Sequence, residues 1–250
     1  MENNESTFCS MWTEHIKVNN CASLFINERF GEDYFFNRVS NILNCHDVSS
    51  VLEKSIRIFS ERRLNCYVYI GDKDDDSETI VEKILLEKRF TLLDTIQAFR
   101  SNINKIKYEN YNIYVNKIDI ALLPVWIDVF CKSFDTFEWK SEVERILKLH
   151  FSELTLLIAY VKSNSSQTPA GCALLFNLDE TTGLYCLGTI PPFRHQGLAK
   201  KIIKVSLDIA TQQNTHYLIL QAFTKEGFQE VYKRLGFELI YKKKIYVLNT

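Results

Sequence analysis

The stretch LGTIPPFRHQGLAKKIIK, residues 187–204, decides the fold. An apolar strand leads into it, and Pro191-Pro192 end that strand because proline cannot donate to a β-ladder. A glycine-containing turn follows, and apolar residues then recur at helical spacing from Ile202 onward. We therefore expect a strand, a turn and the start of a helix in immediate succession.

A helix that begins directly after such a turn is a potential anion site. Its first amides have no partner within the helix, and the helix dipole favours negative charge there. Gly197 and Ala199 carry little or no side chain, which lets a diphosphate approach the backbone. Lys200, Lys201 and Lys204 follow, and one of them can meet a further phosphate. The sequence thus predicts a phosphate-binding loop before the helix.

These residues resemble the acetyl-CoA signature of the GNAT N-acetyltransferase superfamily, [RQ]-x-x-G-x-[GA] after a strand that ends in a proline turn. Its six positions are filled here by Arg194, His195, Gln196, Gly197, Leu198 and Ala199. The family's preceding V-x-P-x-x-R is matched by residues 189–194, with Thr189 in place of valine. Its later L-Y-x-K-x-G-F helix is matched by residues 231–237. Two motifs in the expected order make the resemblance specific.

The resemblance implies an α/β (α+β) fold, with a mixed central sheet flanked by helices, and acetyl-CoA as co-substrate. A primary amine attacks the thioester directly in this family. The strand-end backbone bonds the pantetheine arm and polarises the thioester carbonyl, which is an oxyanion-hole role. We accordingly expect cofactor contacts at Thr189, Ile190, Arg194, His195, Gln196, Gly197, Leu198, Ala199 and Lys200.

Tyr232 is the catalytic candidate, because a tyrosine at this position often protonates the leaving thiolate in the family. The alternative is a packing tyrosine, since Phe228, Val231 and Leu235 share its helix face. The sequence departs from the family at Phe228, which replaces an alanine, and at Lys225, which replaces an asparagine. The resemblance also implies that water relays can serve as the base. A general base cannot be assigned among the available carboxylates of Asp135, Asp179, Glu180 and Glu226.

Two alternatives to an acetyltransferase remain open. The fold can persist as a non-catalytic CoA-binding regulatory module, which the departure at Lys225 and the lack of an assignable base favour slightly. Transfer of another acyl or aminoacyl group is also compatible with the fold. The acceptor, an amine-bearing small molecule or peptide, cannot be identified. Its pocket is expected near residues 125–140, although the aromatic residues there are expected in the core (Trp126, Phe130, Phe134, Phe137 and Trp139).

The chain also repeats a strand–helix–strand pattern. Residues 66–100 and 217–249 follow one plan, and strands at 35–43 and 184–190 precede helices at about 48–64 and 198–213. We therefore expect tandem halves, residues 1–108 and 109–250. The first half resembles a degenerate GNAT domain, because its loop LNCHDVSS has no glycine and carries Asp47, which is expected to cap a helix. One active site is expected, in the second half.

Composition narrows the remaining possibilities. A net charge of −1 gives no basic face for nucleic acid. The amino-terminal residues lack a secretory signal, and no apolar run is long enough for a membrane helix. We expect a cytoplasmic monomer or homodimer that uses no metal. The run DKDDDS, residues 72–77, is expected to be a solvated loop. No C-x-x-C pair occurs, so buried free thiols are expected at Cys9, Cys21, Cys45, Cys66, Cys131, Cys172 and Cys186.

Overall fold

The computed structural model describes residues 2–71, 76–102, 112–163 and 166–248. The chain divides into two compact units, each assembled from separate segments. Unit 1 comprises Met1–Glu5, Phe99–Leu220 and Val231–Glu238, and unit 2 comprises Ser6–Ala98, Gln221–Glu230 and Leu239–Thr250. The predicted boundary between residues 108 and 109 lies outside the described residues, and stays a prediction.

The sheet of unit 1 is mixed, as expected. Its strand order is β6-β7-β8-β9-β10, with β9 and β10 parallel and the other neighbours antiparallel. The strands are β6 (Ile113–Lys117), β7 (Leu154–Ser163), β8 (Ser166–Leu178), β9 (Thr181–Thr189) and β10 (Tyr217–Phe223). In β8, every residue from Ala170 to Phe176 is buried. A continuous apolar run of this kind is typical of a strand covered on both faces.

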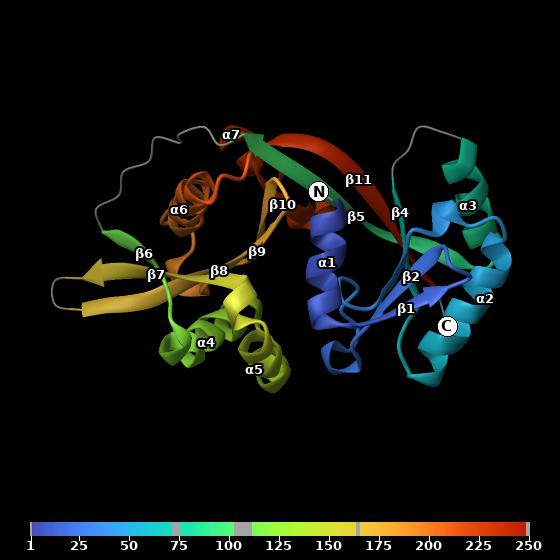
Figure 1. Cartoon of the computed structure of the whole chain (residues 1–250), viewed down its shortest axis with the longest axis horizontal. Helices are drawn as coiled ribbons and strands as arrows, with labels where there is room; N and C mark the ends of the chain where they lie inside the picture. The colour runs from blue at the N-terminus through green and yellow to red at the C-terminus, as the bar shows by residue number, and fades with distance from the viewer. Residues whose placement is uncertain (1, 72–75, 103–111, 164–165, 249–250) are drawn as a thin grey trace. The chain divides into compact units, whose positions relative to one another are not determined.

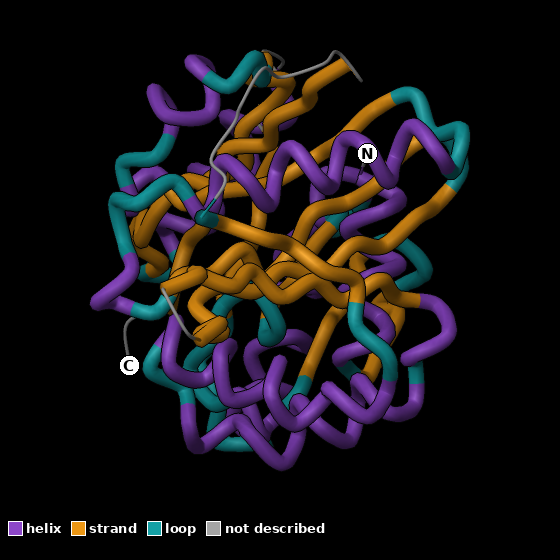
Figure 2. The backbone as a smooth tube through the Cα atoms, turned by 90° about the vertical axis from the view of Figure 1, so that its left-hand side faces the viewer, coloured by secondary structure: helices purple, strands orange, loops and turns teal. Residues whose placement is uncertain are grey.

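Helices supply that cover. Figure 1 shows α6 on one face of strands β6–β9, and α4 and α5 on the other. In the rotated view of Figure 2, helices border the strands on both sides. The helices with residues in this unit are α4 (Leu123–Phe134), α5 (Lys140–Leu149), α6 (Leu198–Gln212) and α7 (Gln229–Arg234). The helix and strand predicted around residues 187–213 are therefore confirmed.

Unit 2 contains a second mixed arrangement of strands, ordered β1-β2-β3-β4-β11. Here β3 and β4 are parallel and the other pairs antiparallel. The carboxyl-terminal stretch forms a single strand that pairs with β4 of this unit. The further elements with residues in this unit are α1 (Glu2–Trp12), β1 (Glu14–Val18), β2 (Ala22–Ile26), β3 (Arg38–Ser40), α2 (Val48–Glu61), β4 (Tyr67–Gly71), α3 (Asp76–Glu87), β5 (Phe90–Asn102) and β11 (Glu238–Leu248).

The first repeat is only partly as predicted. The elements expected at residues 66–100 are present, and Asp47 caps α2 by accepting a bond of 3.0 Å from Ser50 N. The strand expected at residues 35–43 is wrong in extent, because β3 covers Arg38–Ser40 and a 3-10 turn follows at Ile42–Asn44. The predicted acidic loop lies largely outside the described residues. A degenerate GNAT origin for this half stays a prediction.

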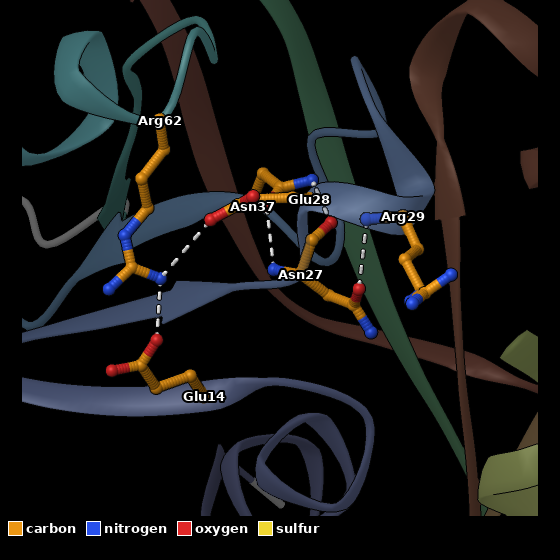
Figure 3. Close-up of polar contacts among 6 residues, drawn as sticks. All are labelled: Glu14, Asn27, Glu28, Arg29, Asn37 and Arg62. Atoms are coloured by element: carbon orange, nitrogen blue, oxygen red, sulfur yellow. Dashed lines mark hydrogen bonds and ion pairs between the residues drawn. The ribbon is translucent and has the colours of Figure 1, made fainter.

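A network of polar contacts fixes the loop before β3 (Figure 3). Asn37, fully buried, accepts from Asn27 N at 2.8 Å and donates to the Gly31 carbonyl at 2.8 Å. Arg62, at the end of α2, pairs with Glu14 and Glu28. These contacts tie the segment at residues 27–37 to the sheet and hold its aromatic residues in place.

The expectation of seven free thiols is wrong for one pair. Cys21 and Cys45 form a disulfide, with their Cα atoms 5.3 Å apart. Cys21 lies between β1 and β2 and Cys45 ends a 3-10 turn, so tertiary folding brings them together and no local motif marks them. Among the described residues, the other five cysteines form no disulfide. Because disulfides are rare in reducing compartments, the cysteines no longer argue for a cytoplasmic location.

Two expected absences concern membranes and metals. Among the described residues, no helix is both long and apolar enough to cross a membrane. Within the same part of the chain, no group of three or more His, Cys, Asp or Glu side chains is arranged to hold a metal ion.

Candidate functional site

A bulge in β9 creates the first part of the candidate site. β9 pairs with β8 from Thr181 to Thr189, whereas its pairing with β10 ends at Gly183. The register with β8 shifts between Cys172 and Leu174, opposite Cys186, whose φ is 52°. A β-bulge bends the strand that carries the extra residue. The bulge therefore accounts for the divergence of β9 from β10.

The backbone amides of β9 divide between its two sides. The N–H of Ile190 donates to the Ala170 carbonyl at 2.9 Å, on the β8 side. Successive residues of a strand direct their amides to opposite neighbours. The N–H groups of Thr189 and Leu187 therefore face the side from which β10 has diverged, and we call these two residues the open edge of β9. The sequence motif singled out Thr189 and Ile190, but not Leu187.

The predicted phosphate loop, residues 194–200, has an anion-binding backbone. Gly197 is the N-cap of α6 and has a φ of 91°, and His195 has a φ of 64°. The first amide bond inside the helix runs from Lys201 N to the Gly197 carbonyl at 3.0 Å. Alternating right- and left-handed residues at a helix start aim amides at one point, which suits an anion. Only glycine adopts the Gly197 conformation without strain.

Several side chains of this loop support it rather than point outward. Leu198 is 2% exposed and anchors the start of α6 in the core. Arg194 donates to the Thr189 carbonyl at 3.1 Å and to the Ser133 carbonyl at 3.0 Å. Arg194 thus joins the end of β9 to the end of α4. Gln196 donates to the Pro192 carbonyl at 3.3 Å and closes the turn.

The three lysines after the loop differ in their surroundings, which bears on which of them can meet a phosphate. The Lys204 ammonium lies 3.0 Å from the Asp208 carboxylate, one helical turn further on. That ion pair removes Lys204 as the first choice for a phosphate. Lys200 and Lys201 lie in the first turn of α6 and are half-buried. The predicted contact at Lys200 therefore has the right place in the helix, and stays a prediction.

Tyr232 lies on α7 and is half-buried. Its ring centroid is 5.5 Å from that of Phe99 and 6.0 Å from that of Phe237. The predicted apolar stripe is wrong in part, because Phe228 is 47% and Val231 49% exposed. α7 covers only Gln229–Arg234, so Phe228 and Leu235 lie outside it and the four residues do not form one helix face. The end of the helix is as predicted, with a left-handed Gly236 of φ 84°.

The segment expected to form the acceptor pocket divides into core and surface. Trp126 is fully buried and donates its indole N–H to the Ala173 carbonyl at 3.0 Å. The core expectation is wrong for Phe134 and Phe137, which are 42% and 51% exposed. A Cβ on Gly188 would lie 2.7 Å from the Phe134 ring. Phe134 therefore rests on β9 beside the open edge.

The candidate bases occupy different environments. Asp135 is the left-handed C-cap of α4, and Asp179 lies in the turn before β9 with a φ of 51°. The Glu180 carboxylate lies 3.3 Å from His216. Glu226, in unit 2, accepts from Phe223 N at 3.1 Å, and burial followed by the charge of Asp94 raises its pKa. None of these contacts assigns the base.

Asn4 supports β9 in a way that sequence reasoning missed. It is 1% exposed, donates to the Phe176 carbonyl at 3.2 Å, and accepts from the Tyr185 hydroxyl at 2.8 Å. A Cβ on Gly183 would collide with both Asn4 and Tyr185. This contact fixes β9 directly before its bulge. No local pattern could reveal a partner so far away in the chain.

Solved structures resemble the chain over nearly its whole length. A GCN5-related N-acetyltransferase from Kribbella flavida is 12% identical, with 99% of this chain and 94% of that chain covered and a TM-score of 0.69. One from Sphaerobacter thermophilus is 12% identical, with 97% and 84% covered and a TM-score of 0.70. A tandem GNAT protein from the clavulanic acid pathway is 5% identical, with 84% and 74% covered and a TM-score of 0.61. At these identities the likeness concerns the fold.

The sequence comparisons identify the family. No curated protein matches the chain. The profile of the acetyltransferase (GNAT) family matches residues 124–237. That range takes in the open edge of β9, the phosphate loop and α7. The chain therefore carries an acetyltransferase domain of the GNAT family, a class of acyltransferases.

Proposed function

We propose that the chain transfers the acetyl group of acetyl-CoA to a primary amine of a small molecule or peptide. The observation that carries the proposal is the succession of two sets of backbone donors along one stretch of chain. The open edge of β9 offers the amides of Leu187 and Thr189. The phosphate loop follows at once, with its left-handed Gly197.

These residues fit the two polar parts of acetyl-CoA. The helix start suits the diphosphate, because amides and dipole act together and Gly197 has no side chain in the way. The open edge suits the amide-containing pantetheine arm, which can pair with β9 as a strand would. Arg194 holds the strand end and α4 together through two carbonyls. The chain thereby presets the spacing between the two sets of donors.

Acetyl-CoA supplies the activated acetyl group as a thioester. The amide of Thr189 donates to the carbonyl oxygen as negative charge develops there, which lowers the barrier. The neutral amine forms the new C–N bond and loses a proton, and the C–S bond breaks. Tyr232 gives its phenolic proton to the departing sulfur and recovers one from solvent. The base that receives the amine proton is left unassigned.

A non-catalytic CoA-binding module is the second candidate. The observation that favours it is Phe228, which replaces the family's alanine directly before α7 and is 47% exposed. An exposed ring there changes the surface that the helix presents, while the phosphate loop stays intact. Transfer of a longer acyl group or of an aminoacyl group uses the same loop and edge. Assays of binding and of turnover separate these possibilities.

The experiment is a calorimetric titration of the chain with acetyl-CoA, beside a matched titration with ADP. Acetyl-CoA should bind more tightly than ADP, because only acetyl-CoA carries the pantetheine arm that the open edge of β9 accommodates. A ligand present at ~100 times its Kd stabilises the folded state by about 2.7 kcal/mol. The melting temperature should therefore rise at millimolar acetyl-CoA. Absence of binding would overturn the proposal.

A further inference from the structure

Unit 2 holds a cluster of acidic and aromatic side chains that the acetyl-transfer proposal does not use. It consists of Asp94 on β5, Tyr34 before β3, Phe223 at the end of β10, and Glu226 in the turn that follows. We call these four residues the Asp94 cluster. All belong to one compact unit, although they come from three separate parts of the chain.

Hydrogen bonds fix the two carboxylates. The Thr224 hydroxyl donates to the Thr95 carbonyl at 2.8 Å, which ties the turn after β10 to β5. Asp94 accepts from Thr95 N at 2.7 Å, and Glu226 accepts from Phe223 N at 3.1 Å. Each acid is thus anchored within one or two residues of the bond that joins the two segments.

The rings of the cluster have fixed positions too. The centroids of Tyr34 and Phe223 are 4.8 Å apart, edge to face. Both side chains are half-buried and pack on a small core of Tyr69, Ile96 and Ile245. Asp33 accepts from two backbone amides of the same loop and holds Tyr34 in place. Part of each ring therefore stays accessible to solvent.

Asp94 is the observation that points to a ligand. It is 6% exposed, and its Oδ2 atom has no hydrogen-bond partner among the described residues. Burying a carboxylate oxygen without a partner is unfavourable unless a positively charged group pairs with it. The Arg38 guanidinium lies over the rings of Phe25, Phe35 and Tyr69, and no hydrogen bond from the described residues reaches the Asp94 Oδ2 atom.

The pKa shifts of the cluster agree with a site that lacks a positively charged partner. Burial, followed by the charge of Asp94, raises the pKa of Glu226. Burial, with a further contribution from Asp94, raises the pKa of Tyr34 to about 12. Within the described part of the chain, no lysine or arginine forms an ion pair with either acid of the cluster. A bound cation would offset the repulsion between the two carboxylates and the cost of burying their charge.

We propose that the Asp94 cluster binds an organic cation, a primary ammonium group carried on an apolar or aromatic body. The two carboxylates would receive the ammonium hydrogens, and the faces of Tyr34 and Phe223 would contact the body through cation–π and apolar contacts. A metal ion fits less well, since no metal-binding group is found among the described residues. The site is independent of acetyl transfer, because it needs no acetyl-CoA.

Calorimetry with phenethylammonium chloride tests the site directly. The control ligand is 2-phenylethanol, which has the same ring and chain without the charge. We expect phenethylammonium to bind, and 2-phenylethanol to bind at least about tenfold more weakly. Asp94→Asn and Glu226→Gln should each weaken phenethylammonium binding by about tenfold or more. Glu61→Gln, an exposed carboxylate on α2, is the matched control and should bind as the wild type does.

Three results would overturn the site. They are no binding of phenethylammonium, equal affinity for 2-phenylethanol, and unchanged affinity in both cluster variants. Circular dichroism establishes that each variant is folded. If Asp94→Asn does not fold, Glu226→Gln decides the matter, because Glu226 lies in the short turn after β10, outside the apolar core, and glutamine keeps its shape. Acetyl-CoA is absent from these titrations, so their outcome is separate from that of the acetyl-transfer proposal.

Discussion

Gly197→Asp is the sharpest perturbation of the phosphate loop. Gly197 caps α6 with a φ of 91°, so any side chain there is strained and stands beside the proposed diphosphate. One unit charge ~5 Å from another, at an effective dielectric constant of about 20, interacts by roughly 3 kcal/mol. That repulsion corresponds to about a hundredfold loss of affinity. The left-handed conformation adds a folding cost of about 1–2 kcal/mol.

Two further variants separate charge from shape. Gly197→Asn has the shape of aspartate without its charge and tolerates the left-handed region. Gly227→Asp introduces the same residue at another left-handed glycine, with φ 71° and no atom within 4 Å of the added Cβ. We expect CoA affinity, measured by calorimetry, to fall most in Gly197→Asp, less in Gly197→Asn, and little in Gly227→Asp.

The melting temperature should fall similarly in Gly197→Asp and Gly227→Asp, by about 2–4 °C per kcal/mol of strain. Melting curves therefore show whether lost affinity reflects unfolding. If Gly197→Asp binds CoA within threefold of the wild type, roughly the error of such an estimate, the diphosphate does not lie at this helix start, and the reasoning fails.

Three other outcomes follow from the structure. Tyr232→Phe should lower kcat by roughly 10²-fold with KM nearly unchanged, and a wild-type rate across pH 7–9 would make the tyrosine structural. Reduction of Cys21–Cys45 should lower the melting temperature, since closing a loop of this length contributes about 3 kcal/mol; a Cys21→Ser variant that melts as the wild type does would contradict this. The raised pKa of Glu226 means that its protonated form is favoured in the folded state, so stability is lost as pH rises through that pKa. The melting temperature of Glu226→Gln minus that of the wild type should accordingly be larger at pH 8 than at pH 4. A difference that is the same at both pH values would refute this.

The second half of the fold could be predicted because its signals are local. Two prolines end β9, a left-handed glycine begins α6, and another ends α7. Proline fixes its own φ, and glycine adopts the left-handed conformations that other residues avoid, so both act locally whatever surrounds them. The phosphate loop was found for the same reason. Its chemistry is carried by the backbone, and glycine is the residue that the backbone conformation requires.

The first half resisted prediction because distant contacts decide it. Arg38 is 1% exposed inside a run that reads as a longer strand, and three aromatic rings enclose it. The last strand of the chain, β11, pairs with β4 in unit 2. Nothing in the composition of either strand names its partner, because strand pairing depends on the whole fold.

Of the two residues of the open edge of β9, the sequence motif pointed to Thr189 and not to Leu187. The bulge that creates it is centred on Cys186, a residue with no marked preference for a φ of 52°. The alternation of amides then selects Thr189 and Leu187 and assigns Ile190 to the sheet. Phe134 was expected in the core with the other aromatic residues of this segment, and in the structure it follows Trp126 and Phe130 along one side of α4. This row of rings reaches beyond the buried part of α4 and leaves the Phe134 ring exposed.

Turnover on a panel of primary amines, with acetyl-CoA as donor, tests the central claim most directly. Release of free CoA thiol and the N-acetylated product are measured together, the first by a thiol reagent and the second by mass spectrometry. We predict that at least one amine yields both in equal amounts and that Gly197→Asp is inactive on it. If the wild type binds acetyl-CoA yet acetylates no amine in the panel, the non-catalytic module replaces the acetyltransferase as the better account.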